Sequence, residues 1–228
     1  MARWTAYPVR SQASPVTIVL FHSACGLRPA VHAAADRLRA AGHEVHVPDL
    51  FDGRTALTVE EGMAVADGIG RDELLRRAIT AAAPYSEQGL VYAGFSLGGS
   101  LAQNAALGDD RARGLLLLHG TSDIADDVAT DIPVRLHVAE PDPPPAPSAR
   151  EVPPEPDDWL NAWYLRKRKA GADVEIHRYR GAGRLCTDHD LPDHDLPDHD
   201  LPDHDLPDPD AEAATRTWAV ALDFLRDL

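Results

Sequence analysis

The most constraining feature of the chain is a Gly-x-Ser-x-Gly motif between a strand-like and a helix-like segment. Residues 89–93 are apolar and partly β-branched, which is typical of a strand covered on both faces, and residues 100–107 are rich in helix formers. Gly94 and Gly98 flank Ser96 and lack a Cβ, so strand and helix can approach closely around a tight turn. This pattern predicts a nucleophile elbow, in which a strained turn holds a serine hydroxyl clear of a sheet. The simpler alternative is a glycine-rich turn with no catalytic role.

The main chain around such an elbow supplies a hydrogen-bond donor as well as a nucleophile. The N–H group of Leu97, the residue after Ser96, would point to the place where a carbonyl oxygen gains negative charge during acyl transfer. Leu97 is therefore a candidate member of an oxyanion hole.

Short apolar runs alternate with helical patterns along the chain. Besides the two segments at the elbow, we expect strands over residues 16–21, 44–48, 114–119, 133–139 and 173–179, and helices over 29–41, 58–83 (one or two), 157–170 and 213–225. This alternation predicts an α/β fold with a mostly parallel, doubly wound sheet and helices on both faces. Together with the elbow it predicts the α/β-hydrolase fold, as a single domain over residues 1–228.

Acyl transfer by a serine also needs a base and a carboxylate that orients the base. On this fold the acid follows the serine in the chain and the histidine comes last. Asp142 comes just after the predicted strand 133–139 and is the candidate acid. Glu140 is a rival, but we expect it to lie still at the strand end. The alternative for Asp142 is an ordinary turn residue before prolines.

The charge of the chain is unevenly distributed. The formal net charge is −15, with 37 acidic and 22 basic residues, but ten aspartates lie between residues 188 and 210. The other 27 acids exceed the bases by five, and this mild acidity argues against nucleic-acid binding. The apolar run at 16–21 is too short to span a membrane and lacks the flanks of a signal peptide. Two cysteines, Cys25 and Cys186, offer no disulfide framework, which favours the cytoplasm.

Several segments of the chain resemble the dienelactone hydrolase family, in particular its short bacterial members. The resemblance extends over nearly all of the sequence from Val16 to Leu225, and the segments that carry it are residues 20–22, 48–55, 93–98, 137–142, 179–183 and 191–193. The resemblance implies a small, monomer-like hydrolase, at most a weak homodimer, that cleaves a small ester or lactone through an acyl-enzyme. It implies no cofactor and no metal.

The resemblance also assigns roles to individual residues. Ser96 would be the nucleophile, where the founding members carry a cysteine, and the N–H of Ala24 would be the second oxyanion donor beside that of Leu97. The founding members place a glutamate next to the nucleophile, and here the matching residue is Ser23. Dienelactone itself is therefore not the expected substrate.

One departure from the family affects the catalytic base. After Gly181-Ala182-Gly183 the family has its catalytic histidine, and this chain has Arg184. A guanidinium stays protonated at ordinary pH and cannot accept the serine proton. We therefore expect an impaired hydrolase, with an inactive homologue that binds a small molecule or a partner as the alternative.

A tandem repeat follows directly. Residues 188–192 read Asp-His-Asp-Leu-Pro and recur three more times, so that 188–210 form a low-complexity insert within the domain. Prolines every five residues and ten aspartates favour a solvated loop. Two alternatives stay open: the repeat histidines bind a divalent metal, or His189 replaces the missing base. The histidines of the repeat are His189, His194, His199 and His204.

Smaller expectations concern two histidines and a basic run. His22 and His119 lie at strand ends and are expected to be hydrogen-bonded histidines of the core rather than catalysts. The basic run at 166–169 is expected to be a solvated helix face, with docking against the acidic repeat as the alternative.

Overall fold

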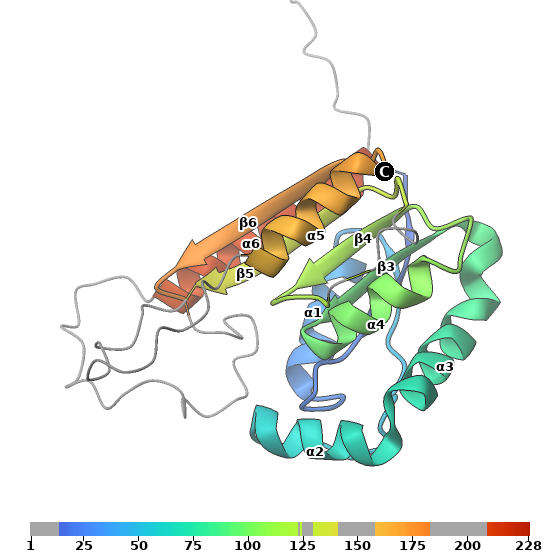
Figure 1. The fold of residues 1–228 in the computed structure, drawn as a ribbon, viewed down its shortest axis with the longest axis vertical. Helices are drawn as coiled ribbons and strands as arrows, with labels where there is room; N and C mark the ends of the chain where they lie inside the picture. Colours follow the sequence, from blue (N-terminus) through green and yellow to red (C-terminus); the bar gives the residue numbers. More distant parts are fainter. Residues whose placement is uncertain (1–13, 123, 125–129, 141–157, 183–208) are drawn as a thin grey trace, which may run out of the picture.

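A six-stranded sheet with the strand order β2-β1-β3-β4-β5-β6 forms the centre of the molecule (Figure 1). The strands are β1 (Thr17–Phe21), β2 (Glu44–His46), β3 (Leu90–Phe95), β4 (Gly114–Leu118), β5 (Val134–Glu140) and β6 (Val174–Arg180). Neighbouring strands pair in parallel throughout this sheet. The computed structural model describes residues 14–122, 124, 130–140, 158–182 and 209–228. Within these ranges it confirms the predicted doubly wound α/β architecture.

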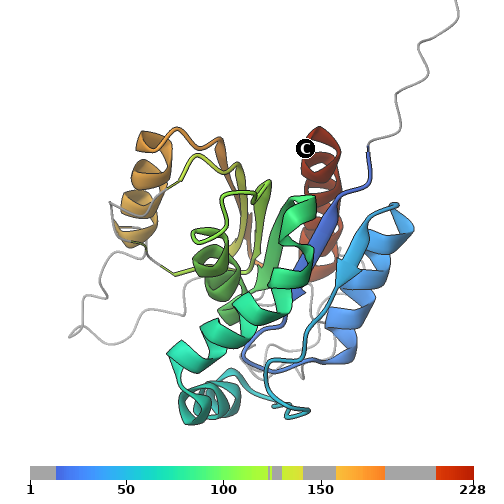
Figure 2. The same cartoon turned by 90° about the vertical axis from the view of Figure 1, so that its right-hand side faces the viewer.

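Helices cover both faces of the sheet, as Figure 2 shows from the side. They are α1 (Pro29–Ala40), α2 (Val59–Ile69), α3 (Arg71–Ala82), α4 (Leu97–Ala106), α5 (Asp158–Lys169) and α6 (Pro209–Asp227), with a short 3-10 helix η1 (Ala83–Gln88). Side chains of α1 and α6 pack into one core cluster, and those of α2, α3, α4 and α5 pack into the other. The sheet is thus buried between two helical layers.

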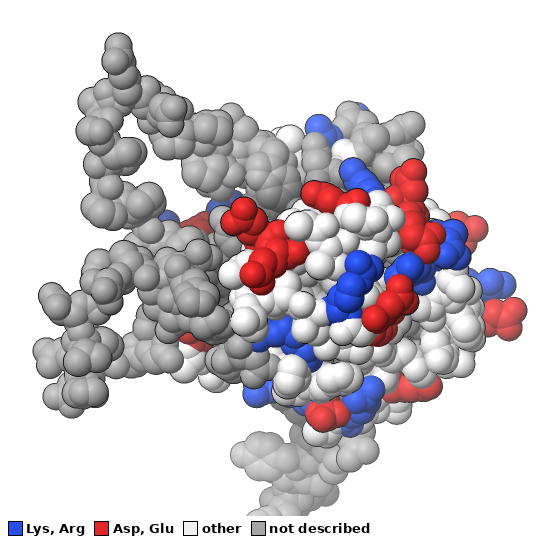
Figure 3. Space-filling model, turned by 90° about the horizontal axis from the view of Figure 1, so that it is seen from below, with Lys and Arg blue, Asp and Glu red and all other residues white. Residues whose placement is uncertain are grey.

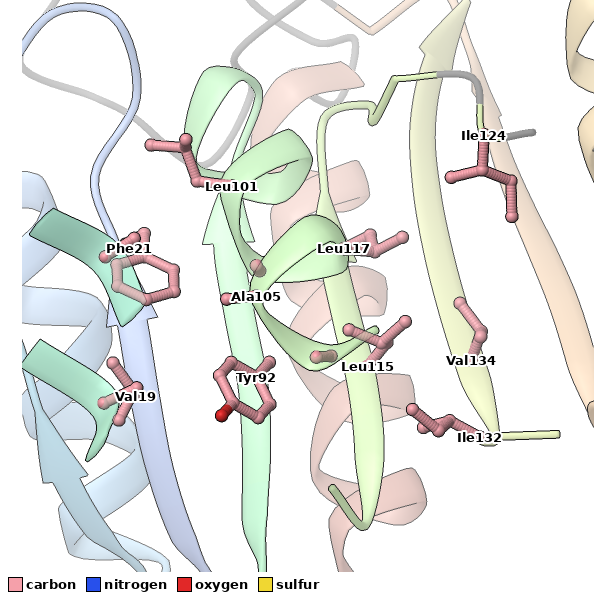
Figure 4. Close-up of a cluster of buried hydrophobic side chains, with 14 of the residues drawn as sticks. Val19, Phe21, Tyr92, Leu101, Ala105, Leu115, Leu117, Ile124, Ile132 and Val134 are labelled. Atoms are coloured by element: carbon pink, nitrogen blue, oxygen red, sulfur yellow. The ribbon is translucent and has the colours of Figure 1, made fainter. Parts of the chain in front are cut away.

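Alternating side chains of the strands fill the two core clusters. On β1, Val19 and Phe21 point toward α4, whereas Ile18 and Leu20 point toward α1 and α6. All four side chains are fully buried, which accounts for the continuous apolar run in the sequence. In Figure 4, Leu101 and Ala105 of α4 lie over the side chains of the central strands.

The structure decides between the one or two helices expected over residues 58–83, and several other boundaries differ from the prediction. The segment 58–83 forms two helices because Gly70 interrupts it with a φ of 92°. The predicted cap is present, since the Thr58 hydroxyl accepts a hydrogen bond from the Glu61 N–H at 3.1 Å. Helix α4 begins at Leu97, three residues earlier than predicted, and α6 begins at Pro209, four residues earlier. Strand β2 ends at His46.

The described surface carries charges of both signs. On the face in Figure 3, acidic and basic side chains are interspersed rather than gathered into a patch of one sign. Among the described helices, none combines the length and the apolar character needed to cross a membrane.

The basic run of α5 is not uniformly solvated, and in this respect the prediction was wrong for one residue. The Lys167 side chain is fully buried, on the helix face that also carries Leu160 and Trp163. Its Nζ has no hydrogen-bond partner among the described residues. Burial lowers the pKa of Lys167 from 10.5 to about 8. A shift of this size corresponds to roughly 3 kcal/mol of lost stability while the amine is charged.

Replacing Lys167 with methionine is expected to stabilise the protein at pH 7 by about 1–3 kcal/mol, because it removes a buried charge that no described residue pairs with and keeps an unbranched side chain in place. From about pH 8 to 10.5 the unfolded chain holds a proton that the folded chain has released, so the free energy of unfolding of the unaltered protein rises with pH. Lys167→Met should lack that rise. Urea unfolding at pH 7 and pH 10 measures both effects.

Lys169→Met is the matched control, because Lys169 is exposed on the same helix. It should change the free energy of unfolding by less than about 0.5 kcal/mol. A Lys167→Met protein that is less stable than the unaltered chain at pH 7 would contradict this account.

Candidate active site

The predicted elbow is a turn between β3 and α4, with Ser96 at its apex. Ser96 has φ 50° and ψ −110°, a left-handed conformation that non-glycine residues adopt rarely. Its N–H donates to the Leu118 carbonyl at 2.8 Å, so the strained residue is fixed to the end of the neighbouring strand β4. Strain of this kind is typical of functional sites, where the surrounding structure compensates for it.

The glycines of the motif permit direct backbone contact around this turn. A Cβ at Gly94 would overlap the carbonyl group of Gly98. A Cβ at Gly98 would overlap the carbonyl oxygens of Phe21 and His22 at the end of β1. The first turn of α4 therefore lies against the carboxyl ends of β1 and β3, and no larger residue fits at either glycine without moving backbone.

The two candidate oxyanion donors lie on the two segments that this contact joins. Leu97 is the first residue of α4, where an N–H has no partner within the helix. Ala24 lies in a tight turn after β1 and is buried. Phe21 of β1 and Gly94 of β3 lie side by side in the sheet. Ala24 comes three residues after Phe21, and Ser96 comes two residues after Gly94. No described residue accepts a hydrogen bond from the N–H of Ala24 or Leu97.

Helix α2 and the loop before it cover the turn that carries Ala24. A Cβ at Gly62 would overlap the Ala24 carbonyl, and a Cβ at Gly26 would overlap the Arg54 carbonyl. The Ala56 N–H donates to the Cys25 carbonyl at 3.0 Å. Sequence reasoning did not identify Gly62, although a glycine in the middle of a helix is a signal for close packing.

Of the two candidate acids, only Glu140 lies among the described residues. Glu140 is the last residue of β5, as expected, and its Oε1 accepts a hydrogen bond from Arg178 Nη1 at 2.5 Å. Arg180 approaches its other oxygen at 3.6 Å. Glu140 is thus engaged by arginines of β6. Asp142 and Arg184 lie outside the described residues, and so does the insert as far as residue 208, so their predicted roles stay predictions. The last two residues of the predicted insert, Pro209 and Asp210, belong instead to the first turn of α6, so the loop is shorter there than predicted.

Three buried histidines lie near the carboxyl ends of the strands. Burial lowers the pKa of His119 to about 4, and burial together with the nearby His177, His119 and Arg135 lowers that of His137 to about 3. His137 Nδ1 lies 2.8 Å from the Tyr179 hydroxyl, and His22 is hydrogen-bonded to main chain on both ring nitrogens. The expectation of a hydrogen-bonded core histidine is confirmed for His22.

Ser96 Oγ has no hydrogen bond to any described residue, so none of the described imidazoles is placed as its base. The described residues also contain no group of three or more His, Cys, Asp or Glu side chains that could hold a metal ion.

A parallel sheet between two helical layers, with a strained serine at a strand–helix turn, defines the class of α/β hydrolases. The sequence profile of the dienelactone hydrolase family matches residues 4–228. The chain therefore belongs to the dienelactone hydrolase family and is a hydrolase by family. No curated protein matches the chain.

Solved structures with the same fold share little sequence with this chain. A dienelactone hydrolase-like promiscuous phosphotriesterase from metagenomic libraries has a TM-score of 0.67 at 18% identity, over 95% of this chain and 87% of that one. A candidate dienelactone hydrolase from Klebsiella pneumoniae has a TM-score of 0.61 at 16% identity, over 97% and 90%. Carboxyl esterase 2 of Tuber melanosporum has a TM-score of 0.59 at 13% identity, over 96% and 78%.

The contact between α2 and the turn predicts opposite effects of two glycine substitutions in one helix. Gly62→Ala should destabilise the protein by about 2–4 kcal/mol, because the new methyl group must displace the Ala24 carbonyl. Gly68→Ala should stabilise it by about 0.5–1 kcal/mol, because no atom lies within 4 Å of the added Cβ and alanine favours the helix. Thermal and urea unfolding measure both, and equal effects at the two positions would contradict the packing described.

Proposed function

We propose that the protein is a serine hydrolase that cleaves a small ester or lactone through an acyl-enzyme. The observation that carries the proposal is the left-handed Ser96 at the strand–helix turn, with the Leu97 and Ala24 N–H groups on the two segments packed against each other there. In this mechanism Ser96 Oγ attacks the substrate carbonyl. The two N–H groups then stabilise the oxyanion of the tetrahedral intermediate.

Proton transfer is the step at which this copy departs from its family. Asp142 would be the acid of the triad, and Arg184 occupies the position of the histidine. An arginine keeps its proton and cannot take that of the serine, so acylation relies on the oxyanion donors and on solvent. We therefore propose a slow hydrolase. Its best substrates should be activated esters, whose leaving groups need no protonation.

A second candidate function is a binding protein without catalysis. It is favoured by the absence of a hydrogen bond between Ser96 Oγ and any described imidazole, together with Arg184 in the base position. In that case the site would hold a small acyl compound or a partner.

The proposed substrate of the hydrolase is a small molecule. The chain is mildly acidic outside the repeat, which argues against a nucleic-acid partner. We propose no membrane partner, no cofactor and a monomer or weak homodimer in the cytoplasm.

A fluorophosphonate probe separates the two candidates, because it bonds covalently to an activated serine. We expect slow labelling of the peptide that contains Ser96, detected as a mass increase, and no labelling after Ser96→Ala. Ser100→Ala, four residues along the same helix, is the matched control and should label at the unaltered rate. No labelling of the unaltered chain after prolonged incubation would favour the binding protein.

Restoring the base provides the second test. Arg184→His should raise kcat/KM for p-nitrophenyl acetate by about a hundredfold or more, because an imidazole can accept the serine proton. The gain should disappear in the Ser96→Ala, Arg184→His double variant and should be missing in Arg184→Lys, which keeps a positive charge. A rate that is the same with arginine and histidine would contradict the placement of residue 184 at the site.

A further inference from the structure

The Ser23 carbonyl is held by two hydrogen bonds at the end of β1. His22 Nδ1 lies 2.8 Å from the Ser23 oxygen, and the Gly26 N–H donates to the same oxygen at 3.1 Å. The Ser23 hydroxyl also accepts a hydrogen bond from the Cys25 N–H at 3.2 Å. The turn that carries Ala24 is thus tied down on its carbonyl side.

The carbonyl of Ser23 and the N–H of Ala24 belong to the same peptide unit. This unit is planar and trans, so its C=O and N–H point in opposite directions. Any group that fixes the direction of the Ser23 carbonyl therefore fixes the direction of the Ala24 N–H. The N–H in question is the proposed second donor of the oxyanion hole.

The other side of the imidazole is fixed as well. His22 Nε2 lies 3.0 Å from the Leu50 nitrogen, whose N–H can only donate, and the Ser23 oxygen at Nδ1 can only accept. These partners require a neutral ring with its proton on Nδ1. Burial lowers the pKa of His22, and this effect outweighs the opposing hydrogen bond of Ser23 and the charge of Asp49. The ring is 1% exposed and meets Phe51 edge-on at 4.7 Å between centroids.

We propose that His22 is a positioning residue, which aims the Ala24 N–H into the oxyanion hole by anchoring the peptide between Ser23 and Ala24 to the turn at Leu50. This inference rests on the proposed function and names a further residue on which that function depends. His22 does not touch the substrate. It acts on the transition state only through the orientation of the peptide group between Ser23 and Ala24.

If the role of His22 were purely structural, replacing it would destabilise the core without affecting the transition state. Two substitutions by amide side chains distinguish a structural role from a positioning role. His22→Asn retains a donor near the position of Nδ1 and can still bond to the Ser23 carbonyl. His22→Gln places its polar end near Nε2, where it can accept from the Leu50 N–H but leaves the Ser23 carbonyl without this anchor.

The expected result is a loss of kcat with an unchanged KM in one variant only. With p-nitrophenyl acetate, His22→Gln should lower kcat at least tenfold and alter KM by less than about twofold, since the oxyanion contact strengthens only in the transition state. His22→Asn should stay within about threefold of the starting kcat. Both variants are measured in the unaltered chain and with Arg184→His, with urea unfolding to confirm folding. Equal losses in both variants, in proportion to lost stability, would overturn the proposal.

A measurement without catalysis keeps the inference separate from the proposed function. If the unaltered chain and the Arg184→His variant hydrolyse the ester no faster than Ser96→Ala, the proposal of serine hydrolysis is wrong. The positioning role of His22 is then tested without catalysis, by long-range nitrogen–proton NMR of its imidazole. At pH 7 the His22 ring should be protonated on Nδ1, and a crystal structure of His22→Gln should show the peptide between Ser23 and Ala24 rotated. A ring protonated on Nε2, or an unmoved peptide, would overturn the positioning role.

Discussion

The direct contact between α4 and the ends of β1 and β3 is the interaction on which the candidate active site depends. It exists because Gly94 and Gly98 present only main chain at the crossing point. The contact brings the first N–H of α4 and the turn after β1 to the same edge of the sheet, and Gly62 lets α2 close over that turn. Ser96, the first residue of α4 and the turn that carries Ala24 thus meet at this edge through backbone packing alone.

In the function proposed above, this backbone packing accounts for an ordered site in a chain with an arginine at the expected base position. The strained Ser96 and the turn that carries Ala24 are held by the main chain, by Gly98 and by the buried His22, and none of these contacts involves residue 184. In serine hydrolases, donors and binding alone retain a rate of about 10³–10⁴ over water after a triad member is lost. The backbone scaffold and the proposed proton relay are therefore separable.

The sequence allowed the sheet, the layers and the elbow to be predicted, because apolar strands, helix formers and glycines each act through local chemistry. It did not reveal that Lys167 is buried, since a basic run on a helix is solvated in most proteins and only tertiary packing places this one amine inside. The anchoring of the Ser23 carbonyl by His22 was also missed. A histidine at a strand end has many possible partners, and the two found here come from the next residue and from a turn 28 residues away.

The left-handed backbone at Ser96 limits which nucleophiles this elbow can carry. A branched Cβ adds a second steric conflict at positive φ, so threonine is excluded although its hydroxyl has similar reactivity. Cysteine and aspartate share the unbranched Cβ of serine and place their reactive atoms on the same side of the turn. Evolution can therefore exchange an alcohol for a thiol or a carboxylate on this scaffold through a single codon, while a secondary alcohol would require a different loop.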